Sequence, residues 1–145
     1  MTPEVALVER LASKTDRMAA MRALIGGVNA RELRSAQVTD AAFDALLGGL
    51  AHPNPQVRWW SIQLLDHCPD ARAIDAIGPL LDDPVPRVRR NAVHAVTCRV
   101  CKPAWSATLP ATVGERLAVL AASDANDEVR AEATAALATV SRGAT

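Results

Sequence analysis

The residues best suited to bind a metal ion lie near the middle of the sequence. His94, Cys98 and Cys101 follow the spacing i, i+4 and i+7, which places them on one face of a helix. A neighbouring helix is expected to bring His67 close to Cys98. Imidazole and thiolate groups are ligands that zinc prefers. Cys98 and Cys101 nevertheless form a lone C-x-x-C motif, so we predict small buried cysteines and neither a metal ion nor another cofactor.

The adjacent tryptophans Trp59 and Trp60 could anchor a partner, because tryptophan is common at the energetic centres of protein interfaces. Adjacent helical residues point in different directions, so the two rings cannot both face the same way. One alternative is that at least one ring packs within the molecule, against the N-terminal region or beneath residues 26–38. The other alternative is a contact surface that includes Trp60.

Motifs of common catalytic sites are absent from the sequence. It contains no Gly-rich phosphate loop, no G-x-S-x-G motif and no H-E-x-x-H motif. Arg87, Arg89, Arg90 and Arg99 make one segment locally basic. If Arg89 is structural, the other three are left for solvent or for a partner. One alternative for them is contact with an acidic peptide or a phosphate, and the favoured alternative is a solvated face. The totals of 16 basic and 16 acidic residues give zero net charge, which disfavours a generic nucleic-acid-binding protein.

The elements that must position these residues are repeated helices. Alanine occupies 29 of the 145 positions and aromatic residues are scarce, which favours closely packed helices over a β-fold. The pairs Val57-Arg58, Val88-Arg89 and Val129-Arg130 each open an alanine-rich stretch. A small residue stands three places after each arginine, and apolar residues stand six and seven places after it. These offsets trace one face of a helix.

Another helical stretch precedes each of these alanine-rich stretches, so the two form a first and a second helix of a pair. The first helices are expected at about residues 3–13, 39–51, 70–82 and 110–123. A weaker copy of the pattern begins at Arg17. We therefore predict one domain over residues 1–145, with a degenerate first repeat at 1–38 and clearer repeats at 39–69, 70–109 and 110–142. One helix pair cannot bury its apolar stripe alone, whereas stacked pairs form a continuous core.

The motif Asp-x-x-x-x-Val-Arg-x-x-Ala-x-x-Ala-Leu/Val resembles HEAT repeats. The spacing of 31 residues between Arg58 and Arg89 resembles that of the HEAT-like repeats of phycobilisome bilin lyases. The strongest match begins at Asp83 and the next begins at Asp124. The resemblance implies a right-handed α–α superhelix in which Asp and Arg of neighbouring turns are hydrogen-bonded. Asp83, Arg89, Asp124 and Arg130 would then be structural. His52 stands where an aspartate is expected before Arg58, so a weaker brace is expected there.

Positions two, five and nine after each arginine should point away from the core. In HEAT-like repeats, partners usually bind along the surface of the second helices, so the resemblance implies a partner-binding surface there. The residues that we expect at its centre are Trp60, Gln63, Asn91 and His94, with Arg90 beside them.

The preferred function is a non-enzymatic scaffold that binds another protein along this surface. One alternative is an enzyme or cofactor handler, similar to bilin lyases or to DNA glycosylases of helical-repeat architecture. For a glycosylase, the only candidate neighbourhood is Trp59-Trp60 with Asp66. Another alternative is a structural unit that self-associates through the open ends of the stack. With no signal peptide and no membrane span in the sequence, we expect a cytoplasmic protein whose partner is neither membrane nor nucleic acid.

Overall fold

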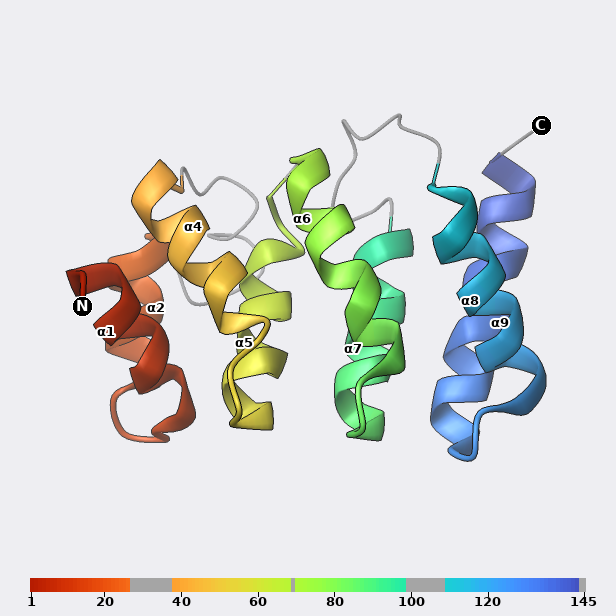
Figure 1. The fold of residues 1–145 in the computed structure, drawn as a ribbon, viewed down its shortest axis with the longest axis horizontal. Helices are drawn as coiled ribbons and strands as arrows, with labels where there is room; N and C mark the ends of the chain where they lie inside the picture. The colour runs from red at the N-terminus through yellow and green to blue at the C-terminus, as the bar shows by residue number, and fades with distance from the viewer. Residues whose placement is uncertain (27–37, 69, 99–108, 144–145) are drawn as a thin grey trace.

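The computed structural model describes residues 1–26, 38–68, 70–98 and 109–143, and every regular element within them is helical. Four helix pairs follow one another along the long axis of the molecule (Figure 1). The first helices are α1 (Pro3–Glu9) with the 3-10 turn η1 (Arg10–Ala12), α4 (Asp40–Gly49), α6 (Ala71–Ile77) with η2 (Gly78–Asp82), and α8 (Ala111–Ser123). The second helices are α2 (Arg17–Ile25), α5 (Pro55–Leu65), α7 (Pro86–Thr97) and α9 (Asp127–Gly143). The predicted all-helical solenoid of four pairs is confirmed. None of the described helices combines the length and apolar character needed to cross a membrane.

Turn residues set the starting point of each second helix. The side chains of Asn54 and Asn126 accept hydrogen bonds from backbone N–H groups in the first turns of α5 and α9. Pro55 and Pro86 open α5 and α7, where a missing N–H group costs nothing. Val85 takes the capping place before α7 and makes no side-chain bond. Helices α5, α7 and α9 therefore each begin three residues before the repeat arginine, so their side chains are in register.

The repeated apolar positions form the core. Val57, Val88 and Val129, each one place before a repeat arginine, are all 0% exposed. The small residues three places after the arginines are equally buried: Ser61, Ala92 and Ala133. The N-terminal copy follows the pattern less well, because Ala20 is buried whereas Ala23 is exposed. A terminal repeat is expected to depart in this way.

A very close approach joins the first two helix pairs. Gly49 on α4 faces Ser61 on α5, and a Cβ atom built on Gly49 would lie 2.2 Å from the Ser61 hydroxyl oxygen. The same Cβ would lie 2.9 Å from a methyl carbon of Val8 on α1. Only glycine fits this place without displacing its neighbours.

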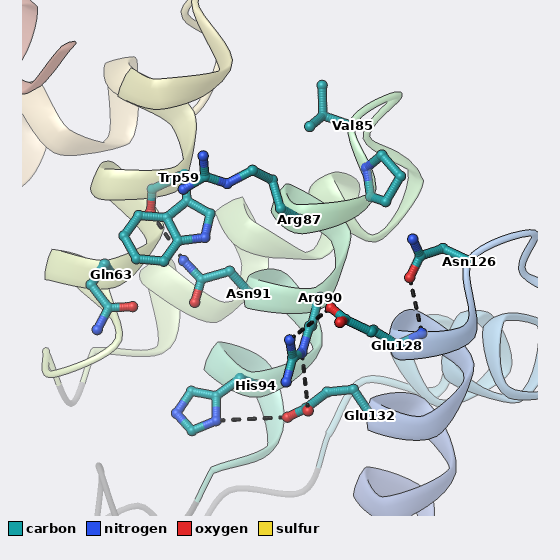
Figure 2. Close-up of a pocket in the computed structure, with 11 residues that line it drawn as sticks. Trp59, Gln63, Val85, Arg87, Arg90, Asn91, His94, Asn126, Glu128 and Glu132 are labelled. Carbon is teal, nitrogen blue, oxygen red and sulfur yellow. Dashed lines mark hydrogen bonds and ion pairs between the residues drawn. The ribbon is translucent and has the colours of Figure 1, made fainter.

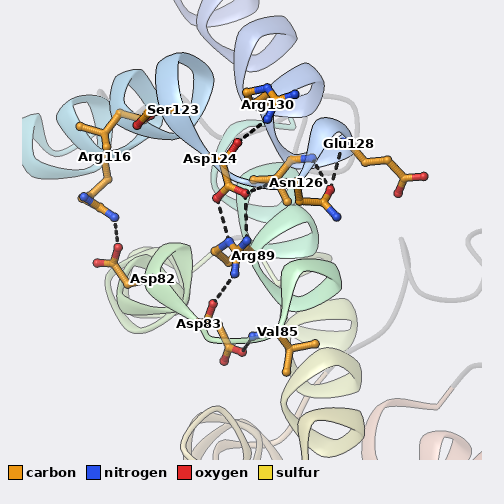
Figure 3. Close-up of polar contacts among 12 residues, drawn as sticks. Asp82, Asp83, Val85, Arg89, Arg116, Ser123, Asp124, Asn126, Glu128 and Arg130 are labelled. Carbon is orange, nitrogen blue, oxygen red and sulfur yellow. Dashed lines mark hydrogen bonds and ion pairs between the residues drawn. The ribbon is translucent and has the colours of Figure 1, made fainter.

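Ion pairs connect the successive repeats. Arg58 donates from Nε and Nη2 to the carboxylate of Asp83, at 2.7 and 3.0 Å. Arg89 makes the same two bonds to Asp124, both at 2.9 Å (Figure 3). These four side chains are at most 14% exposed. The arginine of one repeat thus binds the aspartate of the next, and we call this set of contacts the Arg–Asp ladder.

The repeat arginines of α5, α7 and α9 also hold the turns before their own helices. The guanidinium donates from Nη1 to the backbone carbonyl oxygen six residues earlier, which fixes the turn against the helix that follows it. The bonds run from Arg58 to His52, from Arg89 to Asp83 and from Arg130 to Asp124. At the end of the ladder, Arg130 also pairs with Asp127 in its own helix.

The weaker brace expected at Arg58 is wrong, because Arg58 takes its aspartate from the following repeat. His52 instead occupies the place from which an aspartate would pair with Arg17. The Arg17 guanidinium lies 4.8 Å from the ring centroid of Trp60. His52 Nε2 lies 2.9 Å from a carboxylate oxygen of Glu9. The first junction therefore uses different chemistry from the two that follow it.

Candidate functional site

A groove of about 650 Å³ lies on the surface formed by α5, α7 and α9 (Figure 2). Its walls come from the second helices of three consecutive repeats and from the turns that precede α7 and α9. We call it the second-helix groove. Its lining residues are Trp59, Gln63, Val85, Pro86, Arg87, Arg90, Asn91, His94, Asn126, Glu128 and Glu132.

The α5–α7 side of the groove is built around Trp59. The Asn91 side-chain amide donates a hydrogen bond of 3.0 Å to the Trp59 carbonyl oxygen, and Asn91 is only 9% exposed. The Arg87 guanidinium carbon lies 5.2 Å from the centroid of the Trp59 ring, within the range of a cation–π contact. Trp59 is therefore fixed through its backbone and stacked through its ring.

The α7–α9 side of the groove is charged. Arg90 Nη1 lies 2.9 Å from a Glu128 carboxylate oxygen, and Arg90 Nε lies 3.6 Å from Glu132. The Arg90 side chain remains 50% exposed, so water weakens both ion pairs. This side of the groove is polar, and its charges are balanced.

His94 lies between two carboxylates at the floor of the α7 side. Its Nε2 atom is 3.3 Å from Asp66 Oδ2, and its Nδ1 atom is 4.0 Å from Glu132 Oε1. The Asp66 carboxylate is nearly inaccessible and hydrogen-bonds the ring, which raises the pKa of His94 above its ordinary value. Smaller contributions in the same direction come from Cys98 and Glu132. The two carboxylates therefore stabilise the charged form of the imidazole, and these contacts connect α7 to α5 and α9.

The α5–α7 and α7–α9 junctions place equivalent residues in contact. At each junction, the residue that follows the repeat arginine of one helix contacts two residues of the next helix. Those two residues stand two places before and two places after the repeat arginine of that next helix. Trp59 thus meets Arg87 and Asn91, and Arg90 meets Glu128 and Glu132.

A family model described as HEAT repeats matches residues 5–96 and again residues 43–138. The chain belongs to the HEAT-repeat family. A similar solved structure is the crystal structure of an engineered protein from the Northeast Structural Genomics Consortium, with a TM-score of 0.62 and 22% sequence identity. The alignment covers 97% of this chain and 63% of that chain, so this chain spans less than two thirds of the engineered protein. No curated protein matches the chain.

The HEAT-repeat stack brings most of the sequence-predicted surface residues together. Gln63, Arg90, Asn91 and His94 all line the second-helix groove. Trp60 is not among the lining residues, and Trp59 takes that place. Arg87 and Glu128 also line the groove without having been singled out as partner-binding residues. Their position two places before a repeat arginine is the signal that could have found them.

Trp60 faces the preceding HEAT repeat. Its ring makes an edge-to-face contact with Trp59, with centroids 4.7 Å apart and an interplanar angle of 81°. The other contact of the Trp60 ring is with Arg17 of the first helix pair. Trp60 is partly buried and packs against the core. The interpretation that at least one of the two rings packs within the molecule therefore agrees with the position of Trp60.

The candidate metal ligands are only partly within the described residues. Cys101 lies outside them, as does the basic residue Arg99. Within the described part of the chain, no three His, Cys, Asp or Glu side chains are grouped so as to hold a metal ion. His94 and Cys98 both line a smaller cavity of about 260 Å³, whereas His67 is not among its lining residues.

The glycosylase-like neighbourhood of Asp66 and the tryptophans does not form a single open site. Asp66 is 2% exposed, ends α5 as its C-cap and lies against His94. It is not among the residues that line the second-helix groove. The groove is thus lined by hydrogen-bonding, charged and aromatic groups.

Proposed function

We propose that this HEAT-repeat protein is a non-enzymatic scaffold that binds another protein in the second-helix groove. The observation that carries the proposal is that three consecutive repeats contribute side chains to one continuous groove. A segment bound there would contact α5, α7 and α9 together. Stacked repeats are suited to this role because their second helices form an extended surface.

The composition of the groove supports binding of a protein. Tryptophan and arginine are the residue types most often found at energetic centres of interfaces, and the groove contains Trp59, Arg87 and Arg90. Asn91 and the ion pairs of Arg90 hold these side chains in place before binding. Such preorganisation reduces the entropy lost when a partner binds.

The proposal is tested with two matched double variants. Gln63→Ala/Arg90→Ala removes groove side chains, whereas Arg72→Ala/Asp75→Ala removes exposed side chains from the first helix α6. Proteins captured from the cell of origin are identified and purified, and their binding to the wild type and both variants is measured by calorimetry. We expect the groove variant to weaken Kd at least about tenfold, or roughly 1.4 kcal/mol, and the α6 variant to bind as the wild type does. Equal binding by both variants would place the partner elsewhere.

A second candidate function is self-association through the ends of the stack. Large hydrophobic side chains that are exposed in the described part of the chain lie on the first and last helix pairs. Those within helices are Val5 on α1, Met18 on α2 and Val119 on α8. We expect Val119→Lys to lower the average mass in sedimentation at high protein concentration if these ends associate. A wild-type mass that stays at one chain across the dilution series removes this candidate.

A further inference from the structure

The zero net charge of the chain conceals a separation of charge between its helices. The second helices α2, α5 and α7 contain six arginines and neither aspartate nor glutamate. These arginines are Arg17, Arg22, Arg58, Arg87, Arg89 and Arg90. The first helices α1 and α4 carry only acidic charges. Carboxylates that pair with the arginines of α2, α5 and α7 must therefore come from outside these three helices.

Most of this positive charge near the groove is neutralised within the molecule. Arg58 and Arg89 are held by the aspartates of the Arg–Asp ladder, and Arg90 is paired with two glutamates of α9. Arg87 differs from them, because it has no carboxylate partner among the described residues although its side chain lines the groove. It is exposed to solvent. Arg87 is therefore the groove arginine whose charge an incoming partner can satisfy.

The Trp59 ring holds the Arg87 guanidinium in the groove (Figure 2). The guanidinium lies over the Trp59 ring and forms no ion pair with a carboxylate in the described part of the chain, so its N–H groups are available to a partner. The edge of the planar guanidinium matches the two oxygens of a carboxylate, which arginine binds through paired hydrogen bonds. The stack continues through Trp60 to Arg17, so a second guanidinium lies on the other side of the tryptophan pair.

We infer that the second-helix groove binds an acidic segment of the partner protein, with a carboxylate of that segment seated on Arg87 beside Trp59. This inference rests on the proposed function and adds the chemistry of the partner. A polypeptide fits better than a nucleic acid, because Glu128 and Glu132 at the α9 side would repel a continuous phosphate backbone. Aspartate or glutamate side chains can instead meet the arginine singly, among neutral neighbours.

The test uses the intact protein and an acetylated, amidated hexapeptide that carries one glutamate among five serines. Binding is followed through the indole N–H resonances in ¹H–¹⁵N NMR spectra at low ionic strength. The test variant is Arg87→Gln. The control is Arg72→Gln, which removes an exposed arginine that stacks on Phe43, 4.6 Å from its ring centroid, in the first-helix layer. Thermal melts confirm that both variants fold.

We expect the glutamate peptide to shift the Trp59 indole resonance, and Arg87→Gln to weaken Kd roughly tenfold, as loss of one charge-assisted contact predicts. Arg72→Gln should leave Kd within about twofold, and added salt should weaken binding. A silent Trp59 resonance or equal loss in both variants would overturn the inference. So would equally tight binding of octathymidylate, or of the same peptide with lysine in place of its glutamate. If a captured protein still depends on Gln63 and Arg90 while the glutamate peptide fails, the acidic segment is wrong and the proposed function stands.

Discussion

At the residue scale, Asp124 shows how one side chain connects two repeats. Its carboxylate accepts two hydrogen bonds from Arg89 and one from the backbone N–H of Asn126. The bonds from Arg89 lower the pKa of Asp124 below its ordinary value, so the carboxylate stays charged although its side chain is only 6% exposed. Removing the carboxylate would leave the Arg89 charge buried without its partner.

We expect Asp124→Ala to lower the free energy of unfolding by about 3–5 kcal/mol, the range for breaking a buried ion pair by removing one partner. Asp127→Ala is the control, because the Asp127 side chain is 89% exposed and should cost about 1 kcal/mol at most. Urea unfolding followed by circular dichroism measures both. Equal losses in the two variants would show that the ladder does not couple the repeats.

The same scale supplies a pH dependence at His94. Because hydrogen bonding to Asp66 raises the folded-state pKa, the contribution of His94 to stability is complete below the unfolded value of about 6.5. It is lost as the pH rises through the folded-state pKa. We expect the wild type to lose more stability than His94→Gln between pH 6 and pH 8.5 in urea unfolding. Parallel pH profiles for the two proteins would contradict this account of His94.

At the element scale, helix α4 contains two neighbouring glycines with opposite environments. Gly49 faces Ser61 and Val8 too closely for a Cβ atom, whereas Gly48 has no such neighbour within 4 Å. We expect Gly49→Ala to destabilise the protein by about 1–3 kcal/mol through overpacking. Gly48→Ala should stabilise it by about 0.5–1 kcal/mol, because alanine favours the helix. Thermal unfolding distinguishes them, and a stabilised Gly49→Ala protein would refute the close approach of α4 and α5.

Periodicity in the sequence is enough to place the helices and the core. Val57, Val88 and Val129 stand at the same distance from their turns, and their burial follows from helical phase alone. The same phase brings Gln63 and His94 to the groove. These features depend only on which face of a helix meets the core, and apolar spacing records that face directly.

The placement of the tryptophans could not be predicted in this way. Trp59 and Trp60 differ by about 100° in helical phase, and both lie near the edge of the buried face. Which of them meets the following repeat depends on how neighbouring helices cross, which is a tertiary property. The charges of Arg90, Glu128 and Glu132 carry a clue, because only one register joins them. That register also turns Trp59 toward α7 and Trp60 toward α2.

At the scale of the whole molecule, the repeats form a directional stack. Arg58 and Arg89 each reach forward to the aspartate of the next repeat, so the last two junctions each fix the relative position of two neighbouring repeats. The second-helix groove extends across two such junctions. Its shape therefore depends on the order of the stack as a whole, and not on any one helix. The amino-acid composition alone could not show this pairing of charges between repeats, since the basic and acidic residues cancel in the net charge.

A protein partner bound on the surface of the second helices would change the chemical environment of the groove side chains. Chemical-shift mapping in ¹H–¹⁵N NMR spectra, with a purified partner identified by capture, measures this change residue by residue. We predict that the largest shifts fall on the Trp59 indole and on the side-chain amides of Gln63 and Asn91, with small shifts on α4, α6 and α8. Shifts concentrated on those first helices, or on the two ends of the stack, would contradict the account.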